Sequence, residues 1–133
     1  MGKTIHLLKV SFWAGAIIDG IVAYLMLKTA VLGGTSSLTG YAPGIEYRFA
    51  IGVAASLMLG WTALLIWGGR KPMERKDILV LTVFPVISGI FIATVVTYKA
   101  GFMPLKGTVL ICGSLSPLII LLSYSYWRAT WKS

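Results

Sequence analysis

The hydrophobic positions of this sequence form long uninterrupted runs that are separated by short polar segments. Three of the runs contain no charged residue over 21 consecutive positions, and they are residues 49–69, 78–98 and 107–127. A helix needs about 20 apolar residues to cross the roughly 30 Å hydrocarbon core of a bilayer. The pattern therefore predicts three membrane-spanning helices.

A fourth run, residues 10–32, is as long but contains the charged residues Asp19 and Lys28. Its branched and aromatic apolar residues favour insertion by at most about 5 kcal/mol, whereas an aspartate at the centre of a span costs about 2.5 to 3.5 kcal/mol. We interpret the run as a span that its neighbours must hold in place. A cleaved signal peptide is less favoured, because the apolar region of a signal rarely contains an acid.

The composition agrees with a membrane protein. Of the 133 residues, 57% are hydrophobic and 12% are charged, whereas soluble domains carry about 25% charged residues. The expected fold is all-α, an integral membrane bundle of four transmembrane helices that forms one domain over residues 1–133. The connecting segments are too short to hold a soluble domain, so any chemistry is expected in the bilayer or at its surface.

The basic residues gather at one end of the predicted bundle. Of the 12 lysines and arginines, eight flank the spans at that end: Lys3, Lys9, Arg70, Lys71, Arg75, Lys76, Arg128 and Lys132. The other four are Lys28, Arg48, Lys99 and Lys106. The positive-inside rule then predicts cytoplasmic N- and C-termini in a multi-pass protein of the cell inner (plasma) membrane. The net charge of +8 is dispersed over short loops, so the expected partner is the lipid bilayer and not nucleic acid.

Asp19 is the unusual residue of the first span. It lies nine residues from the predicted cytoplasmic edge, about 13.5 Å at 1.5 Å per residue and so near the bilayer midplane. Residues three and four positions away are small or short: Gly15, Ala16, Val22 and Ala23. Small neighbours allow close helix contact, so Asp19 is expected to face other helices rather than lipid.

Four polar residues fall at the same predicted depth on the other spans: Trp61, Ser88, Ser114 and Ser116. We expect Trp61 or one of these serines to be the hydrogen-bond partner of Asp19. Burial disfavours the charged form of a carboxyl group, so Asp19 is suited to take up and release a proton. The alternative is that Asp19 only holds two helices together by a hydrogen bond.

Two other patterns lie in the spans. Gly52, Ser56 and Gly60 recur every four residues and form a small-residue stripe that predicts a close helix contact, either within the bundle or between protomers. Pro85 and Pro117 lie inside spans three and four and each removes a backbone donor. They predict a packing kink, or a hinge or polar lining.

Redox and metal chemistry have little basis in this sequence. Cys112 is the one cysteine and His6 the one histidine. An intramolecular disulfide is impossible, and a haem or zinc site within one chain is improbable. No metal or other cofactor is expected.

Three stretches, "SFWAGAIIDG", "YRFAIGVAASLMLGWTALLIWGGRKPMERK" and "LTVFPVISG", together resemble a widespread group of small four-span prokaryotic integral membrane proteins with no assigned activity. This resemblance covers most of the chain. It implies four helices in a single compact unit, and it implies no substrate.

An acid in the first of four short spans is also similar to small multidrug resistance transporters. That family carries a glutamate where this chain has Asp19, and its later signature helices do not reappear here. Some of its members insert in both orientations, whereas the charge bias here predicts one orientation. We therefore keep the analogy of a buried titratable acid and do not expect drug export.

These observations leave two principal hypotheses. In the first, a homo-oligomeric transporter or channel uses Asp19 to bind a proton or a cation; an oligomer is expected because four helices offer little room for a pathway. In the second, the protein is a non-enzymatic accessory, assembly or lipid-contact module, with or without a partner subunit, and Asp19 only packs helices. An intramembrane enzyme is not expected, since no second acid, histidine or lysine lies in the cores of the spans.

Overall fold

The computed structural model describes residues 2–33 and 44–131, and Lys132 lies outside them. The helices are α1 (Gly2–Leu32), α2 (Ile45–Arg70), α3 (Asp77–Leu81), η1 (Thr82–Ile87), α4 (Ser88–Lys99) and α5 (Leu105–Trp131). α3, η1 and α4 follow one another without a break, and we call residues 77–99 the third span. Over the described ranges, four helices are long and apolar enough to cross a membrane. The predicted all-α, four-span fold is confirmed, and α1 begins eight residues earlier than expected.

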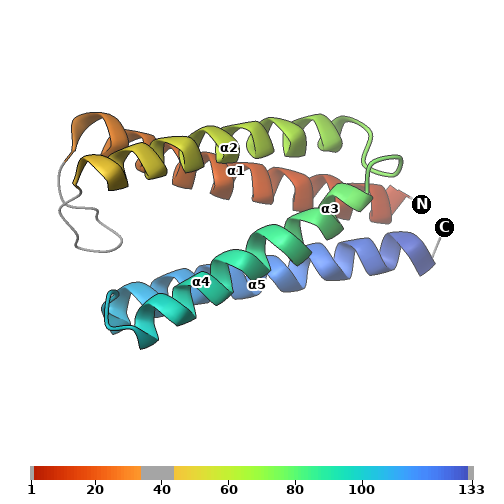
Figure 1. Cartoon of the computed structure of the whole chain (residues 1–133). Coiled ribbons are helices and arrows are strands. Elements are labelled where there is room, and N and C mark those ends of the chain that lie inside the picture. Colours follow the sequence, from red (N-terminus) through yellow and green to blue (C-terminus); the bar gives the residue numbers. More distant parts are fainter. Residues whose placement is uncertain (1, 34–43, 132–133) are drawn as a thin grey trace.

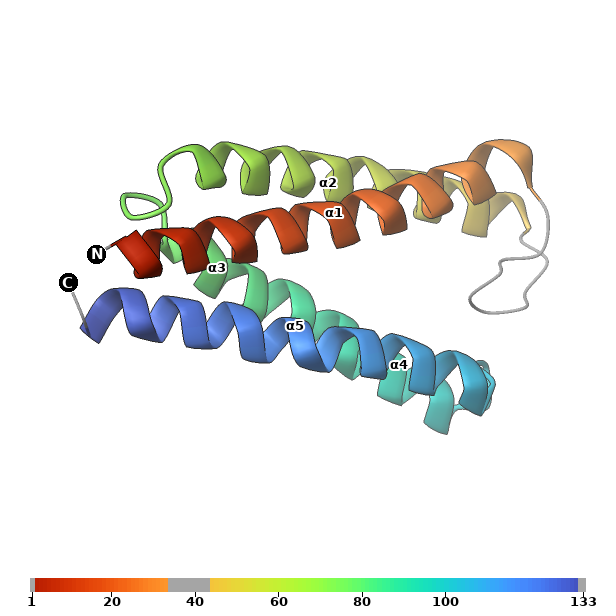
Figure 2. The same cartoon turned by 180° about the vertical axis from the view of Figure 1, so that it is seen from behind.

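The four spans form two helical hairpins. α1 packs along α2, and the third span packs along α5 (Figure 1). Both termini and the loop of residues 71–76 lie at one end of the molecule, which we call the terminal end, and the turn between α4 and α5 lies at the opposite end (Figures 1 and 2). The hairpins meet mainly through α1 and α5, near the terminal end, and they diverge towards the opposite end in both views.

The tightest packing lies in the half of the bundle near the terminal end. All four spans contribute side chains with no exposed surface, among them Leu8, Phe12, Leu65, Leu79 and Leu122. In lipid an apolar side chain gains little by leaving the bilayer, so close fit between helices has to hold such a core. Among the described glycines, the shortest distance from an added Cβ to a neighbouring atom is at Gly68 of α2, where the Cβ would lie 2.5 Å from Cε1 of Phe12.

Two arginines close the ends of the first two spans. Arg48 donates from Nε to the Ala30 carbonyl at 2.9 Å and from Nη2 to the Val31 carbonyl at 2.6 Å. Arg75 donates to the Trp67 carbonyl at 2.6 Å and lies over the Trp67 ring. The last carbonyls of a helix lack intrahelical partners and carry partial negative charge, so a cation there is favourable. Both residues thus cap helices, a role that the sequence analysis missed.

The two prolines have different effects. Pro85 lies in the π-helical segment η1, whereas α5 continues as an α-helix through Pro117. A proline removes one helical hydrogen bond, and a single π-turn is a common local accommodation of such a defect. The predicted irregularity is therefore found at Pro85 and takes the form of a widened helix.

The stripe of Gly52, Ser56 and Gly60 turns away from α1. A Cβ at Gly52 would lie 3.6 Å from the Ala30 Cβ, but Ser56 and Gly60 are exposed, and a Cβ at Gly60 would meet no described atom within 4 Å. Four residues advance a helix by about 40° beyond a full turn, so a stripe at that spacing drifts off a straight contact line. Of the two alternatives, contact within the bundle holds for Gly52 but not for Ser56 or Gly60.

Candidate functional site at Asp19

Asp19 lies on the buried face of α1. Phe12 and Gly15, seven and four residues earlier, share that face; the Phe12 ring lies against Gly68, and a Cβ at Gly15 would lie 3.3 Å from Cδ1 of Leu65. Residues at these spacings stack along one side of a helix. The Asp19 side chain is 8% exposed. It is therefore enclosed by the other helices, as its small neighbours indicate, and it does not face lipid.

The register of the α1–α2 hairpin determines which residues of α2 lie at the depth of Asp19. The adjacent Gly20 lies against Thr62, with 3.6 Å between its Cβ position and Thr62 Cγ2, so Asp19 is level with Trp61 and Thr62 of α2. The indole N–H of Trp61 nevertheless donates to Thr82 Oγ1 in the third span, at 3.1 Å. An indole has one donor and no acceptor. The prediction that Trp61 bonds to Asp19 is therefore wrong.

The three predicted serines also bond elsewhere. Their hydroxyl groups donate to carbonyls of their own helices: Ser88 to Val83 at 2.8 Å, Ser114 to Ile111 at 2.9 Å and Ser116 to Cys112 at 2.7 Å. Ser114 and Ser116 are exposed on α5. A serine within a helix can satisfy its hydroxyl on a preceding carbonyl, which removes the need for a partner on another helix. The structure therefore does not bring these serines together with Asp19 as hydrogen-bond partners.

One oxygen of the Asp19 carboxyl group has no hydrogen-bond partner among the described residues. This oxygen, Oδ2, is buried, and no hydrogen-bond donor or acceptor in the described part of the chain reaches it. Most buried polar atoms in proteins are hydrogen-bonded, and each exception calls for an explanation such as a bound ion, a water molecule or a functional role. Asp19 is the strongest candidate for a functional side chain in this molecule.

Two hydrogen bonds that the sequence analysis missed join the hairpins. Ser11 and Ser125, both fully buried, lie 2.5 Å apart between their Oγ atoms and link α1 to α5. Trp61 and Thr82 link α2 to η1. Hydrogen bonds between membrane helices contribute about 0.6 kcal/mol each on average. Single serines are common in membrane-spanning helices, so nothing in the sequence indicated that Ser11 contacts Ser125.

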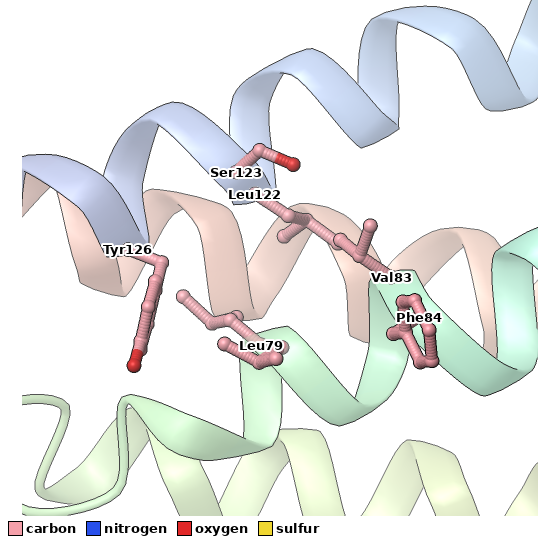
Figure 3. A pocket seen from close by; sticks show the side chains of 7 residues that line it. Leu79, Val83, Phe84, Leu122, Ser123 and Tyr126 are labelled. Carbon is pink, nitrogen blue, oxygen red and sulfur yellow. The ribbon is translucent and has the colours of Figure 1, made fainter.

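An apolar groove of about 240 Å³ lies between the third span and α5 (Figure 3). Its lining is Leu79, Val80, Val83, Phe84, Leu122, Ser123 and Tyr126. Leu122 extends across it towards Val83. The groove carries no charged residue and does not include Asp19, so it suits contact with lipid chains and not polar chemistry.

In the described ranges, no group of three or more His, Cys, Asp or Glu side chains is placed so that it could hold a metal ion. Comparison with protein-family models, with curated proteins and with solved structures finds no match to this chain. The fold and the site themselves therefore define the class. This protein is a small polytopic membrane protein whose helices enclose a carboxyl oxygen, Asp19 Oδ2, that has no hydrogen-bond partner in the described part of the chain.

Proposed function

We propose that this protein transports protons, or cations coupled to protons, and that the Asp19 carboxyl group binds them. The supporting observation is the buried Oδ2 atom without a hydrogen-bond partner among the described residues. An acid near the centre of a span costs about 2.5 to 3.5 kcal/mol, so its presence is expected to serve a purpose.

The alternative role of Asp19, helix packing, is less favoured by the geometry. A packing role needs a hydrogen bond from the carboxyl group to a neighbouring helix, and the hairpins are already joined by the pairs Ser11–Ser125 and Trp61–Thr82. Asp19 takes part in neither pair. Its free carboxyl oxygen is better suited to bind a proton or a cation.

Transport is favoured over catalysis by what surrounds the site. The segments level with Asp19 are residues 55–65, 78–88 and 112–122, and the Cys112 thiol is the one titratable side chain in them. General acid–base catalysis normally uses a second titratable group beside the first. We therefore assign no enzymatic reaction to this site.

We further propose that the terminal end faces the cytoplasm and that the protein resides in the plasma membrane of a prokaryotic cell. The described basic residues at the terminal end are Lys3, Lys9, Arg70, Lys71, Arg75, Lys76 and Arg128. Those towards the opposite end are Lys28, Arg48, Lys99 and Lys106. The positive-inside rule supports this orientation.

Removing the acid tests the proposal. Wild type and Asp19→Asn are reconstituted in liposomes, and proton flux is followed after a pH jump with an internal pH-sensitive dye. We expect the flux of Asp19→Asn to fall to that of protein-free liposomes, because an amide has no ionisation equilibrium in this pH range through which it could bind and release a transported proton. Circular dichroism and thermal unfolding verify that the variant is folded.

Ser116→Ala is the matched control for this experiment. Ser116 is polar and lies in a facing span, but its hydroxyl is exposed on α5 and bonds within its own helix. We expect wild-type flux from it. A folded Asp19→Asn variant with wild-type flux would contradict the transport proposal and would leave an accessory, assembly or lipid-contact role.

Contact between copies of the chain is also proposed, through the exposed part of the small-residue stripe. A Cβ at Gly60 would meet no described atom of its own chain within 4 Å, and Gly60 is exposed. Gly60→Leu is therefore expected to leave the fold intact and to abolish the oligomer, since close backbone approach needs small residues. Cross-linking in liposomes measures this, and Gly113→Leu, also without a described neighbour within 4 Å, is the control. An unchanged oligomer in Gly60→Leu would contradict contact through this stripe.

A further inference from the structure

We propose that the outer face of α1, near the terminal end, binds an anionic phospholipid, whose phosphate group contacts His6 and Lys9 and whose acyl chain lies along Val10 and Ile17. This inference goes beyond the proposed function, because the site lies on the surface of the bundle and does not include Asp19. It concerns which lipid the protein selects from the bilayer.

A shallow groove of about 440 Å³ lies along this face of α1. The buried residues of α1, among them Phe12, Gly15 and Asp19, lie on the opposite side of the helix. The lining residues all belong to α1 and recur three or four positions apart, so they form one stripe on its surface. They are His6, Lys9, Val10, Trp13, Ala14 and Ile17.

The groove is polar at one end and apolar along the rest. Lys9 is ten residues, about 15 Å, from Asp19, and about 15 Å is half the thickness of the hydrocarbon core. With Asp19 near the bilayer midplane, Lys9 lies where the hydrocarbon meets the lipid headgroups, and His6 lies almost one turn further out. Val10 and Ile17 follow on the inner side and are 44% and 56% exposed. The order of the groups therefore matches a phospholipid, with its phosphate outermost and its acyl chain within.

The polar end of the groove has no acidic partner in the described part of the chain. The one ion pair over residues 2–33 and 44–131 joins Lys71 to Glu74, so no acid neutralises the Lys9 ammonium group. The Trp13 indole is exposed, and its Nε1 atom lies 4.0 Å from a Cβ built at Gly69, near the end of α2. Lysine is a common phosphate ligand, and an indole N–H is a donor suited to the headgroup region. Both groups are thus available to a lipid phosphate.

Charge distinguishes this groove from the one between the third span and α5. The lining of that groove contains no charged residue (Figure 3), so it offers a surface to an acyl chain and no contact to a headgroup. At the α1 groove, the choline of phosphatidylcholine would oppose the cations, whereas phosphatidylglycerol carries only the negative charge of its phosphate. One lysine near the membrane surface favours an anionic lipid about fivefold. The groove is therefore expected to select anionic lipid.

Quenching of a fluorophore in the groove tests the proposal. In a Cys112→Ala background, Ile17→Cys is labelled with bimane and the protein is reconstituted in phosphatidylcholine bilayers. Phosphatidylglycerol or phosphatidylcholine with brominated acyl chains, which quench bimane on contact, replaces the host lipid at increasing mole fractions. We expect the quenching curves to give phosphatidylglycerol a binding constant at least about fivefold higher than that of phosphatidylcholine. Equal binding constants would overturn the proposal.

Two variants of exposed lysines on α1 locate the headgroup contact. Lys9→Gln is expected to lower the binding constant for phosphatidylglycerol about fivefold. Lys28→Gln removes an equal charge from the exposed surface at the other end of the same helix and should leave that constant unchanged. Equal losses in the two variants would show attraction to the positive charge of the protein as a whole, and would overturn the proposal.

A second label position is the control for the groove itself. Phe84 lines the groove without charged residues and is 77% exposed, so bimane at Phe84→Cys should report no effect of Lys9→Gln. A loss of the same size at Phe84→Cys and Ile17→Cys would contradict a site on α1. None of these measurements depends on proton flux, so wild-type flux in Asp19→Asn would refute transport and leave the lipid site standing.

Discussion

Phe12→Ala is expected to lower the free energy of unfolding in lipid bicelles by about 2 kcal/mol. In water such a change costs about 3 to 5 kcal/mol, which combines the loss of hydrophobic transfer with the cost of a cavity. The unfolded helices of this protein remain in lipid, so the transfer contribution largely disappears. What remains is the cavity, at about 24 cal/mol per Å³ for a ring-sized hole of about 100 Å³.

The control for this prediction is Phe84→Ala, which deletes the same ring from a side chain that is 77% exposed to lipid. Lipid chains fill the space that the ring leaves, so we expect a change within about 0.5 kcal/mol. Steric-trapping or denaturant titration measures both variants. Equal effects at the two positions would show that Phe12 does not lie in a closed core.

Gly68→Ala is expected to destabilise the same contact from the other helix. The new Cβ would lie 2.5 Å from Cε1 and 3.0 Å from Cζ of the Phe12 ring, and this ring is fully buried. Overpacking of this kind costs about 1 to 3 kcal/mol. Replacing glycine by alanine returns up to about 1 kcal/mol through helix propensity. With the full propensity gain subtracted, the net loss in the unfolding measurement is expected to be up to about 2 kcal/mol.

A double-variant cycle separates the clash from other effects of Gly68→Ala. In the Phe12→Ala background the clashing ring is absent, so adding Gly68→Ala should cost nothing or stabilise the protein, with a coupling energy of at least about 1 kcal/mol. Gly113→Ala, which meets no described atom within 4 Å, measures the propensity effect alone. If Gly68→Ala behaved like Gly113→Ala, the close approach of α1 and α2 would be refuted.

The candidate site was only partly predictable. The small residues around Asp19 predicted that this side chain faces other helices, and its burial agrees with that prediction. The hydrogen-bond partners of Asp19 could not be predicted from the sequence. Counting residues along a helix gives the depth of a side chain, but its contacts also depend on how each helix is rotated about its axis. Trp61 lies at the depth of Asp19, and yet its N–H points to Thr82.

The sequence by itself determined the number of spans, the ends at which the positive charges lie and the depth of Asp19. These are one-dimensional properties, because a charge-free run of about 20 residues is long enough to cross the bilayer whatever lies beside it. Only the tertiary structure decided which faces pack, that Ser11 meets Ser125, that Gly60 faces outward and that Asp19 Oδ2 has no hydrogen-bond partner over residues 2–33 and 44–131. In water, polar residues mark the exposed face of a helix. In lipid both the buried and the exposed faces are apolar, so the pattern carries little information about which side of a helix meets its neighbours.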